Sequence, residues 1–230
     1  MAHYDFILNH GTSLIFNEIT QLMESHQVSL GLKDGKIASL TVQPNDTAEQ
    51  TLNLKGLHIL PGVIDSQVHF REPGMTHKED LESGTRSALL GGVTTIFEMP
   101  NTIPSTTTKE LFLDKLQRAE NRAHCNYAFF IGGSSENINQ LAELEKMNHC
   151  SGVKVFLGSS FGNLLVDDES IFDQILQHGS RRVIIHSEDE ARLKQRKQIA
   201  IDEGHPRAHS IWRDEESALI STQKSIFILF

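Results

Sequence analysis

The chain has 230 residues, of which 38% are apolar and 22% charged, and its formal net charge is −9 from 21 basic and 30 acidic residues. This apolar content is enough for a buried core and excludes a disordered chain. Nucleic acid is excluded as a partner, because the phosphate backbone is bound by dense Lys/Arg clusters and the sequence has none.

The first residues, Met-Ala-His-Tyr-Asp, lack the basic and apolar regions of a secretory signal, so we expect a cytoplasmic protein. The apolar run at 225–230 is too short to span a bilayer, and no membrane association is expected. Cys125 and Cys150 are not in CxxC spacing, which indicates reduced thiols rather than a disulfide or a structural zinc site.

Residues 1–58 are expected to form a small β-sheet domain. Short apolar runs occur at 6–8, 13–16 and 28–32, and Asp34-Gly35 is typical of a tight hairpin. Each run has the length of a strand.

Residues 59–230 alternate short apolar runs with amphipathic segments, which predicts repeated β/α units and a parallel sheet. We expect strands at 57–70, 93–99, 126–131, 152–157 and 182–186. Helices are expected from about residue 77 with a Thr76/Glu79 capping box, after 106–108, around 138–147, after Asp167-Asp168, and from 188 past 212. A (β/α)8 barrel takes about 250 residues, whereas about 170 follow residue 60. The predicted fold is therefore α/β, an incomplete TIM (β/α)8-type barrel of about five units.

The first strand of this barrel carries candidate site residues. Side chains alternate along a strand, so Asp65, Gln67, His69 and Arg71 are expected to share one face. His69 lies where the strand ends, and catalytic groups of such barrels gather at the carboxyl ends of the strands.

Lys154 lies in the apolar run 152–158. A buried ammonium is costly unless it is paired or neutralised. Two interpretations stay open: the side chain reaches the strand end or pairs with a carboxylate, or a neutral amine takes up carbon dioxide. The resulting carbamate has two oxygens that can bridge two metal ions about 3.5–4 Å apart.

Other polar residues also stand at strand ends. His186 ends the run 183–186 and is a candidate zinc ligand, with a loop or capping histidine as the alternative. Arg71 and Asn101 could hold a substrate carboxylate through a guanidinium and an amide, with loop hydrogen bonding as the alternative. The glycine-rich segment 158–162 is expected to be an active-site loop, and 204–209 a loop interrupted by Pro206.

Over about residues 50–218 the sequence resembles dihydroorotase of the amidohydrolase superfamily. The motifs that carry the resemblance are at 65–74, 98–102, 154–160 and 185–189. The resemblance implies a zinc enzyme of pyrimidine biosynthesis that interconverts N-carbamoyl-L-aspartate and L-dihydroorotate. It implies that His69 ligates one zinc, that carboxylated Lys154 bridges two and that His186 binds the second. Arg71 and Asn101 would then grip the substrate carboxylate.

The sequence departs from the family pattern in two respects. Gln67 stands where a ligand imidazole is expected, and an amide oxygen is a poorer zinc ligand. The family's sixth-strand histidine and eighth-strand aspartate have no counterpart, so we expect a chain truncated in its C-terminal half.

These departures leave two competing hypotheses. One is a non-catalytic, dihydroorotase-like structural partner of aspartate transcarbamoylase. The other is an amidohydrolase that acts on another cyclic amide, a hydantoin or allantoin. Open strand edges in an incomplete barrel also predict homo-oligomerisation or poor solubility.

Overall fold

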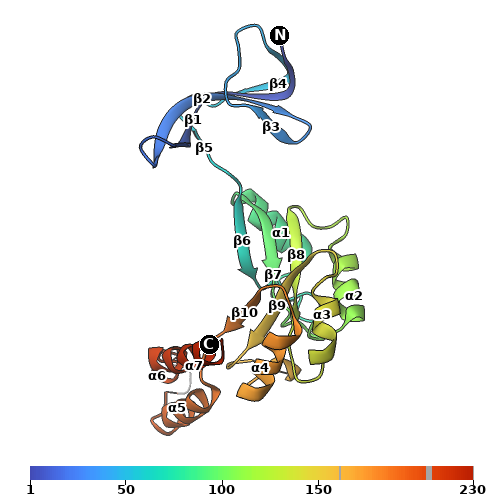
Figure 1. The fold of residues 1–230 in the computed structure, drawn as a ribbon, viewed down its shortest axis with the longest axis vertical. Coiled ribbons are helices and arrows are strands. Elements are labelled where there is room, and N and C mark those ends of the chain that lie inside the picture. Colours follow the sequence, from blue (N-terminus) through green and yellow to red (C-terminus); the bar gives the residue numbers. More distant parts are fainter. Residues whose placement is uncertain (161, 206–208, 230) are drawn as a thin grey trace. The chain divides into compact units, whose positions relative to one another are not determined.

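The computed structural model describes residues 1–160, 162–205 and 209–229. Parts of the loops expected at 158–162 and 204–209 therefore lie outside the described residues. The chain forms two compact units, Met1–Gly62 and Val63–Phe230 (Figure 1).

The N-terminal unit is a five-stranded sheet. Its strands are β1 (His3–Asn17), β2 (Leu22–Lys33), β3 (Lys36–Ser39), β4 (Thr47–Asn53) and β5 (His58–Ile59). The order is β3-β2-β1-β4, with β5 paired to β1. Asp34 and Gly35 have φ angles of 52° and 69°, which confirms the predicted tight hairpin between β2 and β3.

The runs 6–8 and 13–16 belong to one long strand, β1, whose pairing register with β2 shifts between Leu8 and Gly11. One strand prediction in this region was wrong. The segment 58–59 pairs with β1 and so belongs to the small sheet, not to the first barrel strand. A shift in register allows one strand to continue where the sequence pattern is interrupted.

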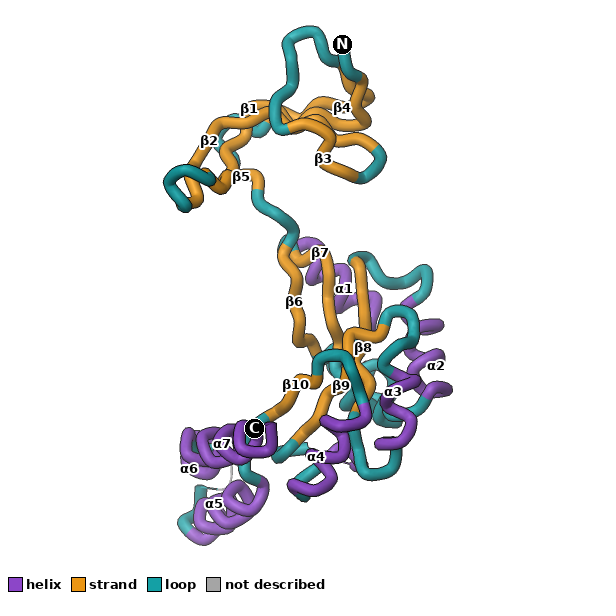
Figure 2. The backbone as a smooth tube through the Cα atoms, in the orientation of Figure 1, coloured by secondary structure: helices purple, strands orange, loops and turns teal. Residues whose placement is uncertain are grey.

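The second unit is a curled parallel sheet in the order β10-β9-β8-β7-β6 (Figure 2). Its strands are β6 (Val63–Val68), β7 (Val93–Glu98), β8 (Asn126–Gly132), β9 (Cys150–Phe156) and β10 (Val183–His186). The predicted five strands and the incomplete TIM-type barrel are confirmed.

Helices α1 to α4 cover one face of this sheet (Figure 1). The helices are α1 (Leu81–Leu90), α2 (Lys109–Ala119), α3 (Leu141–Leu144), α4 (Glu169–His178), α5 (Glu190–Asp202), α6 (His209–Trp212) and α7 (Glu215–Leu229), with 3₁₀ turns at Ile138–Gln140 and Gly162–Leu164. Alternate strand residues such as Ile96 and Phe129 pack against Phe112 and Phe172 of the helices and form the core. The segment from 221 to 229 continues α7.

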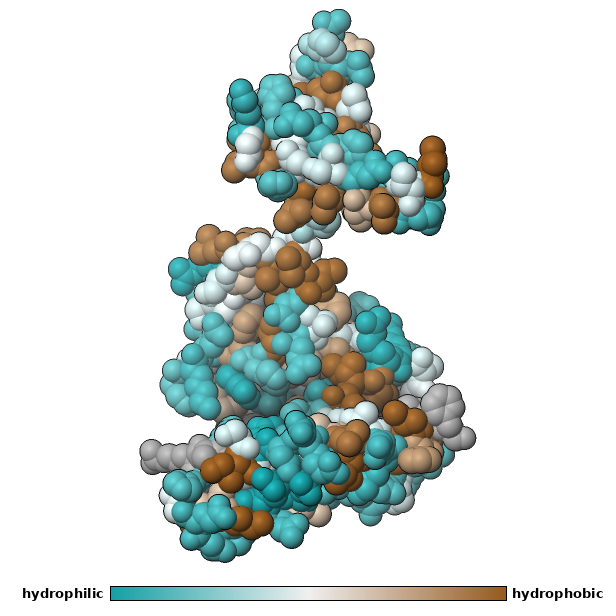
Figure 3. All heavy atoms as spheres, turned by 90° about the vertical axis from the view of Figure 1, so that its left-hand side faces the viewer, coloured by the Kyte–Doolittle hydropathy of each residue, from teal (hydrophilic) through white to brown (hydrophobic). Residues whose placement is uncertain are grey.

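Exposed apolar side chains occur on both units, and Figure 3 shows apolar residues among polar ones on the face drawn. In the first strand of the barrel unit, Val63 and Ile64 are 54% and 61% exposed. Among the described residues, no helix has the length and apolar character needed to cross a membrane.

Helix α1 begins four residues later than expected. Its N-cap is Asp80, which accepts a hydrogen bond from the Ser83 N–H, and Ser83 completes a capping box. The N–H of Leu81 donates to the buried Glu72 carboxylate at 2.8 Å. The predicted Thr76/Glu79 box was wrong, because the loop carboxylate and Asp80 together satisfy the first helical N–H groups.

Replacing Asp80 by alanine is expected to lower the free energy of unfolding by about 1 kcal/mol. The Ser83 N–H lowers the pKa of Asp80. The cap therefore stabilises the fold above the unfolded-state pKa of about 3.9, and this contribution is lost as the pH falls through the lower folded-state value. Urea unfolding at neutral and acid pH checks this. Glu79→Ala is the control, and an equal loss in that variant would contradict the cap assignment.

Candidate functional site

The end of β6 sets the direction of the first candidate residues. Asp65 pairs with Ile96 and Val68 with Glu98, so three steps of β6 match two of β7. This bulge breaks the alternation, and the prediction that Asp65 and His69 share a face was wrong. By register Asp65 lies on the face of Ile96, whereas His69, next to Val68, falls on the opposite one. The Asp65 carboxylate accepts a hydrogen bond from the Gln67 N–H at 3.0 Å.

His69 and Asn101 are joined directly, although 32 residues separate them. His69 Nδ1 lies 2.8 Å from Asn101 Oδ1. An amide oxygen accepts, so Nδ1 carries the proton and Nε2 is the basic nitrogen. Burial lowers the pKa of His69, the charges of Arg71, Lys154 and Lys115 lower it further, and the Asn101 contact opposes the shift. The ring is therefore held neutral with Nε2 free of protein partners among the described residues.

Arg71 and Gln67 stand on either side of His69. Arg71 lies beyond the strand in a left-handed conformation, φ 69°, which is uncommon for a residue with a side chain. Within the described residues its guanidinium has no ion pair or hydrogen bond, although its charge acts on His69. Gln67 is exposed. Arg71 is thus available to an anion.

Lys154 is buried to 1% exposure on the face of β9 opposite the helices. Its Nζ lies 5.0 Å from the centre of the Phe156 ring, and no carboxylate pairs with it in the part of the chain that the structure describes. Burial lowers the pKa of Lys154 to about 8. The first interpretation of this lysine requires either a pairing carboxylate or a side-chain end that reaches the surface. Among the described residues the structure shows neither.

His186 ends β10 beside Phe156, its register partner, with ring centres 6.0 Å apart. Its Nε2 lies 2.5 Å from Glu188 Oε2, and Arg213 binds the same carboxylate. Burial alone would raise the pKa of Glu188, but hydrogen bonds from Arg213 and His186 outweigh it and lower the pKa. The sequence analysis missed Glu188 and Arg213, and the polar run directly after His186 was the signal for Glu188.

The structure thus brings the candidates together in one pair and one chain of contacts. His69 contacts Asn101, Lys154 contacts Phe156, and Phe156 contacts His186. His69 is also within reach of the Lys154 charge. No three His, Cys, Asp or Glu side chains converge on one point among the described residues.

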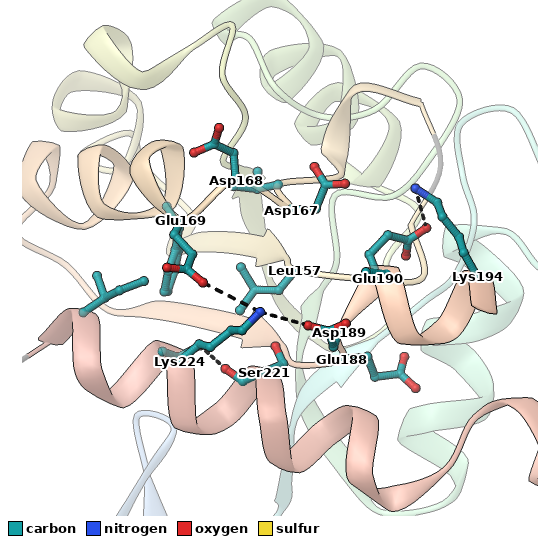
Figure 4. Close-up of a pocket in the computed structure, with 15 residues that line it drawn as sticks. Leu157, Asp167, Asp168, Glu169, Glu188, Asp189, Glu190, Lys194, Ser221 and Lys224 are labelled. Atoms are coloured by element: carbon teal, nitrogen blue, oxygen red, sulfur yellow. Dashed lines mark hydrogen bonds and ion pairs between the residues drawn. The ribbon is translucent and has the colours of Figure 1, made fainter. Parts of the chain in front are cut away.

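A separate cavity of about 260 Å³ lies between α4, α5 and α7 (Figure 4). Lys224 of α7 bridges Asp189 and Glu169, with nitrogen–oxygen distances of 3.1 and 3.7 Å. The cavity contains Glu188 but neither His69, Lys154 nor His186. Lys194 pairs with Glu190 in the same cavity, and the Lys224 ion pairs connect α7 to α4 and to the residue that caps α5.

The comparisons show which family part of this chain resembles. Residues 56–162 match the family described as dihydro-orotase-like. Over these residues, just under half of the chain, it resembles the dihydro-orotase-like family. The resemblance inferred from the sequence motifs is confirmed at this level.

Relatives of this dihydro-orotase-like chain carry more than one activity name. It is 40% identical over 131 residues to the multifunctional protein CAD of Squalus acanthias (56% of this chain, 6% of that protein). It is 38% identical over 135 residues to an allantoinase of Deinococcus radiodurans (58% and 30%). It is 36% identical over 147 residues to a dihydroorotase of Methanosarcina mazei (63% and 32%).

A solved structure shares the fold. The L-hydantoinase (dihydropyrimidinase) of Arthrobacter aurescens superimposes with a TM-score of 0.87 at 23% identity, covering 98% of this chain and 50% of that one. The dihydro-orotase-like chain thus spans half or less of these relatives. The names of the relatives define a family of cyclic amide hydrolases without separating its substrates.

Proposed function

We propose that this chain is a cyclic amide hydrolase of the dihydroorotase type, which interconverts N-carbamoyl-L-aspartate and L-dihydroorotate. One observation carries the proposal: the buried amine of Lys154, which has no carboxylate partner among the described residues, lies over the Phe156 ring, which in turn contacts His186, and its charge reaches His69. A structural lysine in such a place would need an opposite charge. A lysine whose pKa is lowered to about 8 instead has a substantial neutral fraction that can take up carbon dioxide.

The donor set fits part of a zinc site. His69 offers Nε2, because Asn101 holds Nδ1. A carbamate on Lys154 would add two oxygens. His186 would bind through Nδ1, with Glu188 on Nε2 orienting the ring, as carboxylates do for ligand histidines. When bound, zinc would act as a Lewis acid on the amide carbonyl. The side chain of Gln67 offers only an amide oxygen, which is a weak zinc ligand, so these residues provide only part of the zinc coordination.

Arg71 supports dihydroorotate over other cyclic amides. Dihydroorotate carries a carboxylate on its ring, whereas hydantoin and allantoin carry none. The Arg71 guanidinium has no partner among the described residues, and its charge is felt by His69. The Asn101 oxygen is occupied by His69, which leaves its amide N–H groups as donors to the substrate.

Arg71→Met is expected to raise the KM for dihydroorotate by roughly 10- to 150-fold, the equivalent of a lost charged hydrogen bond of about 1.5–3 kcal/mol. Steady-state hydrolysis of dihydroorotate, hydantoin and allantoin with added zinc measures this. The control is Arg86→Met, because Arg86 pairs with Glu82 on the surface of α1. Hydrolysis of hydantoin or allantoin without turnover or binding of dihydroorotate would contradict the proposed substrate.

A further inference from the structure

A buried ion pair lies behind the candidate site. Glu98 ends β7 and Lys115 lies in α2; both side chains are 0% exposed, with 2.8 Å between Lys115 Nζ and Glu98 Oε2. Removing two charges from water costs free energy that their attraction rarely repays, so an apolar pair would stabilise the fold as well or better. The pair therefore calls for an explanation other than stability.

Lys115 reaches the loop after β7. Its Nζ donates to the Met99 carbonyl oxygen at 3.0 Å and lies 5.2 Å from the centre of the Phe129 ring. Two residues later in this loop, Asn101 receives the hydrogen bond from His69. Lys115 thus holds the backbone from which Asn101 projects.

Glu98 faces the loop after β6. Burial raises the pKa of Glu98, and Lys115 together with the backbone amides of Phe70 and Arg71 opposes this. Neither carboxylate oxygen has a well-aligned hydrogen bond within the described residues. The carboxylate is therefore held by the Lys115 charge and by the amide dipoles of the two residues that follow His69.

The loop after β6 needs such a support. Arg71 has a positive φ of 69°, a conformation that a residue with a side chain keeps only where its surroundings fix it. The Glu98 carboxylate beside the Arg71 amide provides a fixed negative charge at this point.

We propose that Glu98 and Lys115 are positioning residues that fix the two loops against each other, so that the His69–Asn101 contact and the Arg71 side chain keep their places. This inference rests on the proposed function only for its effect on zinc and substrate. The pair touches neither of them in the proposed site and acts through the backbone of residues 70, 71 and 99.

The test uses the full chain with Glu98→Gln, Lys115→Met and the double variant Glu98→Gln/Lys115→Met. The matched control is Lys109→Met/Glu143→Gln, an exposed pair with 3.8 Å between its charged atoms. NMR of isotope-labelled histidine reports the hydrogen-bonded Nδ1–H of His69, assigned by its loss in His69→Gln. Zinc affinity is measured by competition with a chelator.

We expect each single variant to shift or broaden the His69 Nδ1–H signal and to weaken zinc binding by roughly 10- to 100-fold, as for other outer-shell partners. The control should change neither. If the single variants fail to fold, the test relies on the double variant, in which neither charge is left unpaired. A folded double variant with the wild-type His69 signal overturns the inference.

The NMR signal is independent of turnover. A chain without zinc binding or dihydroorotate hydrolysis whose His69 signal still responds to Glu98→Gln would refute the proposed function and keep the positioning role.

Discussion

Hydrolysis of dihydroorotate is expected to fall to background when Lys154 is replaced by methionine. The substitution keeps the apolar length of the side chain beside Phe156 and removes the one buried amine proposed to become a carbamate. The fold should be retained, because Lys154 has no ion pair to lose among the described residues and methionine suits an apolar site.

The same lysine predicts a pH dependence. Burial lowers the pKa of Lys154 to about 8, so the neutral amine, which alone reacts with carbon dioxide, increases as the pH rises through this value. Intact-mass measurement in bicarbonate should therefore show one added carbon dioxide above about pH 8 and progressively less below it. Lys146→Met, at an exposed lysine, is the control. Full activity of Lys154→Met would refute the proposed role.

Phe129→Ala is expected to lower the free energy of unfolding by about 3–5 kcal/mol. Phe129 is 0% exposed and packs edge-on against Phe112 of α2, with ring centres 6.3 Å apart. Its removal leaves a cavity under Lys115, whose Nζ lies over the ring. Thermal and urea unfolding measure the effect.

The control for this variant is Phe227→Ala. Phe227 is 83% exposed, and surface substitutions usually change the free energy of unfolding by less than about 0.5 kcal/mol. Equal losses in the two variants would show that α2 and β8 do not form the core described here.

The sequence predicted the β/α part of the fold well, because each element there carries its own signal. The apolar runs at 126–131 and 152–157 became β8 and β9, and Asp168 caps α4 as expected. The start of α1 was misplaced, because Glu72, outside the helix, satisfies one of its first N–H groups. No local pattern contains that tertiary contact.

The candidate site was less predictable. His69, Lys154 and His186 were identified individually from their positions at strand ends, but their roles stay predictions. The Glu98–Lys115 pair was missed, although a glutamate in the apolar run 96–99 was a visible signal. Lys115 has no such signal, because a lysine on a helix normally lies in solvent.

The bulge between Asp65 and Val68 makes one stretch of β6 tolerant of a change in length and the next stretch sensitive to it. Asp65 and Val68 pair with Ile96 and Glu98, which lie on one face of β7. Deleting Ser66 or Gln67 would therefore give regular pairing and leave His69 on its present face. Inserting one residue between Val68 and His69 would instead turn the imidazole toward the helices and dismantle the site.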